Sequence, residues 1–221
     1  MYLSKIELEA LINEGIKIID VSNVYLANVK IEKGTIIHPN TTIINSTIGK
    51  NNTIYENSRI VNTIIGDNNT IISSHISDSK IASNTSIGPM AHIRMNSTIE
   101  DDCRIGNFVE FKNTHFKKAA KCAHLSYLGD CTCGERVNIG CGVVTVNYDG
   151  KVKSQTIIEN DAFIGSNVNL IAPIKIGSFA LVAAGSTISK DVAAGDMHIE
   201  RSQLFIKENY GIKYLNKEKK C

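Results

Sequence analysis

The sequence predicts an all-β fold, a parallel β-helix built from hexapeptide repeats. Large aliphatic residues recur every six positions along most of the chain, with occasional steps of five, and Gly, Asn, Asp and Ser fall between them. A period of six fits neither a 3.6-residue helix nor an alternating strand. Each hexad therefore supplies one short side of a coil, with its aliphatic side chain directed toward the axis. The recurring positions are Ile31, Ile37, Ile43, Ile48, Ile54, Ile60, Ile65, Ile71 and Ile76, then Ile81, Ile87, Ile93, Ile99, Ile105 and Phe111, and finally Ile158, Ile164, Leu170, Ile176, Val182 and Ile188.

The N-terminal segment, residues 1–28, is predicted to hold a short helix over residues 4–14 followed by a lead-in to the coils. Ser4 and Glu7 have the spacing of a capping box, and Gly15 stands where the helix should stop. We expect this helix to cover the first coil, because an open parallel edge invites pairing with another chain.

The β-helix is predicted to span residues 29–192. Within it the polar segment 147–155 indicates a loop that leaves the wall, and residues 114–127 indicate an irregular stretch, because the clean aliphatic series is lost there. After residue 192 the pattern stops, so residues 193–221 are predicted to form an irregular C-terminal tail.

Composition excludes several classes of protein. Of the 221 residues, 43% are hydrophobic and 21% are charged, which is typical of a globular chain, and the net charge of +2 gives no case for nucleic acid as a partner. No apolar stretch is long enough to span a membrane and no leader is seen, so we expect a cytoplasmic protein without membrane insertion.

The cysteines do not indicate a metal site. Cys131 and Cys133 form a C-x-C pair that is shorter than zinc-binding spacings, and no histidine follows at ligand distance. We therefore expect no metal, with reduced cysteines acting as small apolar fillers near the six-residue register.

Seven sequence strings carry a family likeness. They are IGPMAHIR at 87–94, IGNFVEFKN at 105–113, CAHLSYLGD at 122–130, VNIGCG at 137–142, VNYDG at 146–150, IENDAFIGSNVNLIAPIKIG at 158–177 and VAAGSTISKDV at 182–192. With these strings the chain resembles the C-terminal acetyltransferase domain of the bifunctional N-acetylglucosamine-1-phosphate uridyltransferase / glucosamine-1-phosphate N-acetyltransferase (GlmU) family. The resemblance implies a left-handed coil and a homotrimer whose sites lie at the subunit interfaces.

The resemblance also implies an activity. The family transfers acetyl from acetyl-CoA to the amine of glucosamine 1-phosphate, which feeds UDP-N-acetylglucosamine and cell-wall biosynthesis, and this transfer needs acetyl-CoA as co-substrate but no metal. Nothing in the sequence resembles the family's N-terminal uridyltransferase domain, so no uridyl transfer is expected from this chain.

The catalytic residues that the resemblance implies are His124, Asn147 and Cys141. An ammonium cannot attack a thioester, and an imidazole with a pKa near 6.5 is suited to accept its proton at neutral pH. Asn147 is expected to hold the amino sugar near His124. The backbone N–H of Cys141, where the family usually has Ala, is expected to stabilise the oxyanion.

Further residues carried over from the family are expected to bind the two substrates. Guanidinium and ammonium groups suit the sugar phosphate, and the turn after Arg94 is expected to be altered by Met95-Asn96, which replaces the family's common Pro-Gly. Those expected to bind the sugar phosphate are Arg94, Lys112, Tyr127, Asn138 and Lys153. Those expected to bind coenzyme A are Cys141, Tyr148, Ser166, Ala184, Arg201 and Lys207.

Three alternatives stay open at this point. The first is an acetyltransferase whose acceptor is another amino sugar. The second is a non-catalytic solenoid that serves as partner to a separate nucleotidyltransferase. The alternative to the homotrimer is a monomeric rod.

Overall fold

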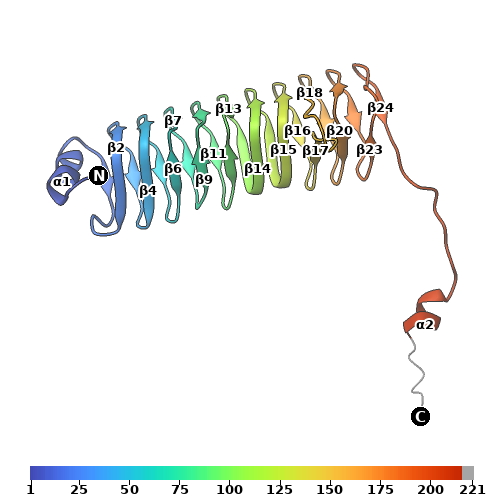
Figure 1. Ribbon diagram of the computed structural model, residues 1–221, viewed down its shortest axis with the longest axis horizontal. Coiled ribbons are helices and arrows are strands. Elements are labelled where there is room, and N and C mark those ends of the chain that lie inside the picture. The colour runs from blue at the N-terminus through green and yellow to red at the C-terminus, as the bar shows by residue number, and fades with distance from the viewer. Residues whose placement is uncertain (216–221) are drawn as a thin grey trace, which may run out of the picture.

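The structure, a computed structural model, describes residues 1–215 and is a rod of stacked coils. Figure 1 shows the coils following one another along a single axis, with a helix across the N-terminal end and a tail leaving the C-terminal end. The predicted fold class, a left-handed parallel β-helix of hexapeptide repeats, is confirmed.

The first helix, α1 (Lys5–Asn13), has the predicted capping box. The Glu7 N–H donates to Ser4 Oγ at 3.4 Å, and the Ser4 N–H donates to Glu7 Oε2 at 2.6 Å. Hydrogen bonds from Ser4 lower the pKa of Glu7 below its usual value. Leu8 is the buried residue of this helix and joins the core of the first coils, so α1 covers the end of the rod.

The strands are short, as expected for the flat sides of a coil, and all belong to one sheet among the described residues. They are β1 (Lys17–Ile18), β2 (Val24–Ile31), β3 (Ile36–Ile37), β4 (Thr41–Ile48), β5 (Thr53–Ile54), β6 (Arg59–Val61), β7 (Ile64–Ile65), β8 (Thr70–Ile71), β9 (His75–Ser77), β10 (Lys80–Ile81), β11 (Ser86–Ile87), β12 (His92–Arg94), β13 (Thr98–Ile99), β14 (Arg104–Phe116), β15 (Lys121–Cys133), β16 (Asn138–Ile139), β17 (Val144–Val146), β18 (Thr156–Ile158), β19 (Phe163–Ile164), β20 (Asn169–Ile171), β21 (Ile174–Ile176), β22 (Leu181–Val182), β23 (Thr187–Ile188) and β24 (Met197–His198).

Each strand pairs in parallel with the equivalent strand of the next coil. Ile37 pairs with Ile54, and Ile54 pairs with Ile71, so one coil uses 17 residues in this region. Every recurring aliphatic position of the sequence series is buried, which confirms that the six-residue period marks the axis of the rod. Side chains of successive coils thus stack on one another and exclude water from a single continuous core.

The prediction of an irregular stretch over residues 114–127 is wrong. Phe116 pairs with Ile99 in the coil before and with Cys133 in the coil after, and Cys122 pairs with Ile105. All of these side chains are buried. The coil continues without interruption because an aromatic ring and two thiols occupy axial positions where other coils use isoleucine.

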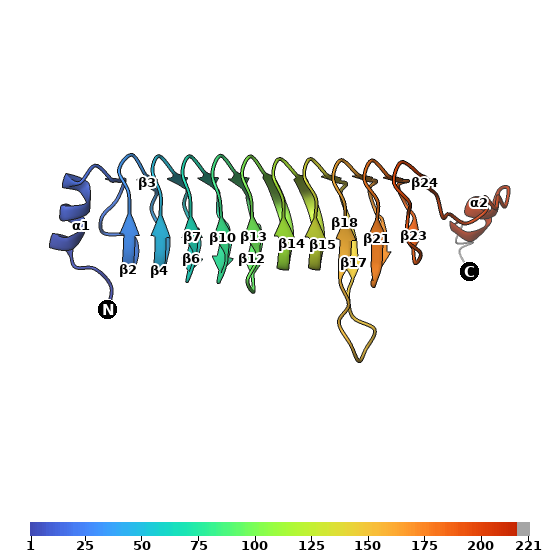
Figure 2. The ribbon, with the colours of Figure 1, turned by 90° about the horizontal axis from the view of Figure 1, so that it is seen from above.

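The strands extend somewhat beyond the limits predicted for the β-helix. β1 and the start of β2 lie within residues 1–28, and β24 lies within residues 193–221. That last segment also contains a helix, α2 (Tyr210–Leu215), and its final six residues lie outside the described part. Between β17 and β18 the chain leaves the wall as a projecting loop (Figure 2).

Buried asparagines occupy one inner position of the N-terminal coils. Asn69 is almost fully buried, its Nδ2 donates to the Ala82 carbonyl at 2.9 Å, and its Oδ1 accepts the Thr85 N–H at 2.8 Å. Its own N–H donates to Asn52 Oδ1 at 2.8 Å. The Asn69 side chain therefore joins its own coil to the next one, and the Asn52 side chain joins the preceding coil to that of Asn69, where backbone groups would otherwise lack partners.

Replacing Asn69 with alanine is expected to lower the free energy of unfolding by about 1–3 kcal/mol, because a buried N–H and a buried carbonyl lose their partners. Urea unfolding followed by circular dichroism measures this loss. Lys80→Ala, an exposed change on the neighbouring strand β10, is the control and should leave stability nearly unchanged. Equal stability of both variants would contradict a structural role for this amide.

Candidate active site

Arg94 ends β12 and lies beside Lys112 of β14. Its Nε and Nη2 both donate to Glu110 Oε1, at 2.9 and 2.6 Å, so the guanidinium already faces a carboxylate. The turn that follows has two consecutive left-handed residues, Met95 and Asn96, with φ of 56° and 61°. The guanidinium stays half-buried on the face of the rod.

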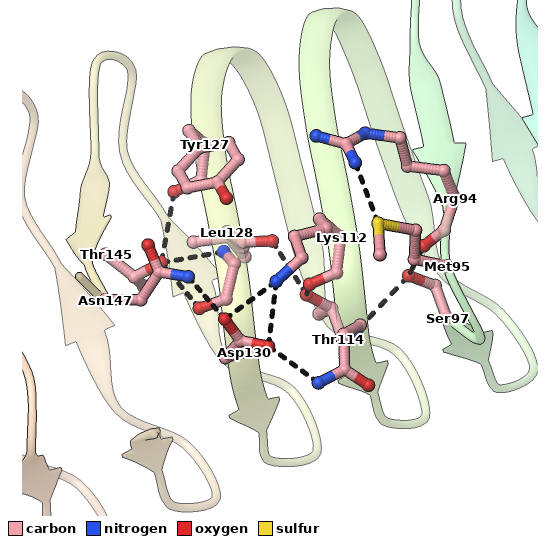
Figure 3. Close-up of polar contacts among 12 residues, drawn as sticks. Arg94, Met95, Ser97, Lys112, Thr114, Tyr127, Leu128, Asp130, Thr145 and Asn147 are labelled. Atoms are coloured by element: carbon pink, nitrogen blue, oxygen red, sulfur yellow. Dashed lines mark hydrogen bonds and ion pairs between the residues drawn. The ribbon is translucent and has the colours of Figure 1, made fainter. Parts of the chain in front are cut away.

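Lys112 is a buried lysine whose ammonium is held by one carboxylate. Its side chain is 9% exposed, and its Nζ donates to Asp130 Oδ2 at 2.9 Å and to Oδ1 at 3.1 Å. Asn113 Nδ2 donates to the same Oδ1 at 2.7 Å. Figure 3 shows Lys112 reaching Asp130 from the neighbouring coil.

Asn147 completes this arrangement. It is buried at the end of β17, and its Nδ2 donates a short hydrogen bond to Asp130 Oδ2. We call Lys112, Asn113, Asp130 and Asn147 the acid–amide cluster. Tyr127 lies near it, and its ring lies over Gly129, where any Cβ would collide with the ring and hydroxyl. The glycine therefore gives Tyr127 room to lie along the strand.

The carboxyl group of the acid–amide cluster is ionised at neutral pH. Burial by itself would raise the pKa of Asp130, but the hydrogen bonds from Asn113, Lys112 and Asn147 and the charge of Lys112 lower that pKa below its usual value. The stability that these contacts contribute is present above the unfolded pKa and is lost as the pH falls through the lowered one.

His124 lies in β15 and is exposed. Its Nδ1 is 2.9 Å from Oδ1 of Asn107, its partner in the preceding coil. When Nδ1 carries the hydrogen and donates it to this oxygen, the Nε2 lone pair is left free to accept a proton. The residue after it, Leu125, turns the corner with a φ of 37°.

Several predicted coenzyme A residues lie in line with His124. The parallel register puts Cys141, Ser166 and Ala184 at the equivalent position of the next three coils. We call this line, from Asn107 to Ala184, the base column. Successive members are about 4.8 Å apart, the spacing of neighbouring parallel strands. Cys141 is exposed, and within residues 1–215 no hydrogen bond engages its N–H.

The C-terminal end of the base column meets the tail. Arg201 Nε donates to the Ala184 carbonyl at 2.8 Å, so this predicted coenzyme A residue lies beside another. Lys207 lies further along the tail, with Nζ 4.0 Å from the centre of the Tyr210 ring.

The remaining predicted residues lie apart from both groups. Asn138 is in β16, between Lys121 and Phe163 of the adjoining coils. Tyr148 and Lys153 face each other across the projecting loop, both are exposed, and the Tyr148 hydroxyl donates to the Gly150 carbonyl at 2.7 Å.

The base column and the acid–amide cluster do not meet within one chain. His124 stands before one corner of its coil and Asp130 at the next, so a full side separates them, on the order of 15 Å. Among the described residues no hydrogen bond links the two groups. The base column and the acid–amide cluster are thus two half-sites on one rod, and Asn138, Tyr148 and Lys153 lie outside both.

Sequence reasoning missed three polar partners, Asn107, Glu110 and Asp130. All three lie inside the strings that carried the family likeness, but none was given a role. The signal was a separation of 16 to 18 residues from a predicted site residue, which is one coil: Asn107 to His124, Glu110 to Arg94, and Asp130 to Lys112 or Asn147.

The buried cysteines behave as the apolar fillers that the sequence predicted. Burial raises the pKa of Cys103, Cys122 and Cys131 to about 12 and that of Cys133 well above its ordinary value, so these thiols stay protonated. Within residues 1–215 no three candidate ligands gather as a metal site would require, and no helix has the length and apolarity of a membrane span.

The chain matches a repeat family and several curated proteins. Residues 155–190 match the model of the bacterial transferase hexapeptide (six repeats). Over 204 residues, 91% of this chain, the sequence is 46% identical to bifunctional protein GlmU of Exiguobacterium sp., and over 198 residues, 89% of this chain, it is 50% identical to that of Geobacillus sp.. The chain is a homologue of the GlmU proteins.

The match covers only part of each relative. It takes in 45% of the Exiguobacterium GlmU and 43% of the Geobacillus GlmU, so the chain spans about half the length of the curated relatives it matches. This coverage is consistent with the C-terminal acetyltransferase domain of GlmU that the sequence resembles. Among solved structures, a UDP-N-acetylglucosamine acyltransferase from Campylobacter jejuni is similar over 82% of this chain and 70% of that one, with a TM-score of 0.46 and 16% identity.

Proposed function

We propose that the chain transfers acetyl from acetyl-CoA to the amine of glucosamine 1-phosphate, which gives N-acetylglucosamine 1-phosphate for UDP-N-acetylglucosamine and cell-wall biosynthesis. The observation that carries this proposal is the base column. In this column the imidazole of His124 lies one coil away from the backbone N–H of Cys141, which makes no hydrogen bond within the described residues. The column continues through Ser166 and Ala184, which the GlmU likeness assigns to coenzyme A.

The proposed chemistry uses this spacing. His124 Nε2 takes a proton from the substrate ammonium, and the free amine then attacks the thioester carbonyl. The Cys141 N–H donates to the oxygen of the tetrahedral intermediate, on which negative charge develops. The nitrogen that has added to the carbonyl carbon then loses its second proton to solvent. When the carbon–sulfur bond breaks, the imidazolium gives its proton to the departing sulfur, so the products are an amide, free coenzyme A and one proton released to solvent.

The sugar phosphate would bind at the other half-site. Arg94 offers a two-pronged donor and Lys112 a point charge, as a phosphate requires. Glu110 and Asp130 already compensate these two charges. Lys153 in the projecting loop has no ion pair within residues 1–215, so it would bring the uncompensated positive charge toward the phosphate.

A homotrimer with sites at subunit junctions is part of the proposal. The two half-sites are a full side apart on one rod, so packing of rods side by side would bring the base column of one chain to the acid–amide cluster of another. The large apolar side chains left exposed on the outer faces, among them Phe108, Leu125 and Phe163, support such packing.

A second acceptor class is favoured by one observation. Carboxylates already compensate the charges of both Arg94 and Lys112. An amino sugar without a phosphate would therefore meet no unpaired cation at either of these two residues. Acetylation of another amino sugar is therefore the second candidate.

Release of coenzyme A, measured with a thiol reagent on the purified chain, tests these proposals. We expect kcat/KM for glucosamine 1-phosphate to exceed that for glucosamine by about tenfold or more, the value of at least one charge-assisted contact. Reactions without acceptor are the control for thioester hydrolysis. Equal rates with both sugars would favour the second candidate, and no transfer to any amino sugar would favour a non-catalytic solenoid partner of a separate nucleotidyltransferase.

A further inference from the structure

We propose that Asp130 is a positioning residue of the acceptor half-site, and that it fixes both the ammonium of Lys112 and the direction of the Asn147 amide. This inference rests on the proposed function. The GlmU likeness supplies expected roles for Lys112 and Asn147. The role of Asp130 is inferred only from its contacts in the structure.

The contacts of Asp130 use both of its oxygens. Oδ2 accepts from Lys112 Nζ and from Asn147 Nδ2, while Oδ1 accepts from Asn113 Nδ2 and again from Lys112 Nζ. The side chain is only 15% exposed. One carboxylate therefore bridges three coils, and two of its partners, Lys112 and Asn147, are predicted site residues.

For Lys112 the carboxylate decides where the ammonium lies. A buried lysine without a counter-charge tends to extend its stem until the head reaches water. The two contacts with Asp130 hold the head at the corner of the coil instead. The remaining ammonium hydrogen can then be directed at one place on a bound phosphate.

For Asn147 the carboxylate decides which end of the amide faces the substrate. An ionised carboxylate accepts hydrogen bonds and cannot donate, so the NH₂ group must face Asp130. Figure 3 shows the amide nitrogen of Asn147 toward Asp130 and its oxygen directed away. The oxygen is thus presented as an acceptor, which matches an amino group that carries N–H donors before the attack.

The same corner of the rod shows what a purely structural aspartate looks like. One left-handed residue per coil turns this corner in most coils, and their side chains are short amides or carboxylates. These residues are Asn28, Asn45, Asn62, Asp78, Asn113 and Asp130. Asp78 Oδ1 accepts from Asn62 Nδ2 at 2.9 Å, and no lysine forms an ion pair with Asp78 within the described residues. Asp78 is therefore a matched control for Asp130.

The test compares Asp130→Asn with Asp78→Asn, since asparagine keeps the shape and tolerates the left-handed corner. We expect Asp130→Asn to lower kcat/KM for glucosamine 1-phosphate by about 10–100-fold, the size expected when a buried charged group loses its partner. The KM for acetyl-CoA should stay within about twofold of wild type, because that substrate uses the base column. Asp78→Asn should leave both parameters unchanged.

A second comparison uses Lys112→Met. If Asp130 acts partly through Lys112, the double variant should lose less than the product of the two single losses. Wild-type kinetics for Asp130→Asn, or equal losses for acceptor and acetyl-CoA, would overturn the positioning role alone. A wild-type chain that acetylates no amino sugar would instead overturn the proposed function, and this inference with it.

Discussion

Replacing His124 with alanine is expected to lower kcat by about 10²–10⁴-fold while the KM for each substrate changes little, because a positioned base contributes this factor. Without the imidazole the ammonium must lose its proton to water before it can attack the thioester. The hydrogen bond to Asn107 orients the ring but binds neither substrate, which is why the loss should fall on turnover. Steady-state release of coenzyme A with glucosamine 1-phosphate measures both parameters.

His115→Ala is the matched control for this prediction. His115 lies in β14, is also partly exposed, and its Nε2 is 2.7 Å from Glu100 Oε1, so its removal also breaks a ring contact between coils. It belongs to neither half-site, and we expect wild-type turnover. If His124→Ala kept full turnover, His124 would not be the base, and the catalytic role proposed for the base column would be contradicted.

The architecture of the core could be predicted because the spacing of the aliphatic residues indicates which side chains face the axis. An aliphatic side chain at every sixth position indicates a residue that faces the axis of a coil. Each of these residues, Ile54 and Ile164 among them, is buried. The capping box at Ser4 could also be predicted, because its two residues are close to each other in the sequence. The coil through Phe116 and Cys122 could not be predicted from the six-residue spacing of aliphatic residues. An aromatic ring and a thiol fill the axis there in place of isoleucine, so the aliphatic series is interrupted although the coil is not.

The polar partners of the site could not be predicted for a different reason. Whether Asp130 contacts Asn147 depends on which residues of successive coils lie side by side. The coil length varies between 16 and 18 residues in this region and before it, as Arg59 to His75, Asn113 to Asp130 and Ser86 to Arg104 illustrate. An error of one residue moves a side chain from the outer face to the core. The expected residues could be named, but the carboxylates that orient them required the register.

Replacing Phe111 with alanine is expected to lower the free energy of unfolding by about 3–5 kcal/mol, the range for truncating a fully buried aromatic side chain. Phe111 has no solvent exposure, and its ring centre is 4.9 Å from that of Phe116. No neighbour can fill the space easily, because the stacked coils hold the walls of the core at a fixed spacing. Urea unfolding followed by circular dichroism measures the loss.

Phe108→Ala makes the same truncation on the same strand, three residues away, where the ring is 59% exposed. As the control, it should cost less than about 0.5 kcal/mol in the isolated chain. A larger cost for Phe108 that depends on protein concentration would show that another subunit covers this ring, as the proposed trimer requires. Equal and small losses at both positions would contradict a close-packed axis at this level of the rod. Because Glu110 and Lys112 flank Phe111 along β14, softening of the core here should also loosen the acceptor half-site, so the variant should lose acceptor affinity before it loses affinity for acetyl-CoA.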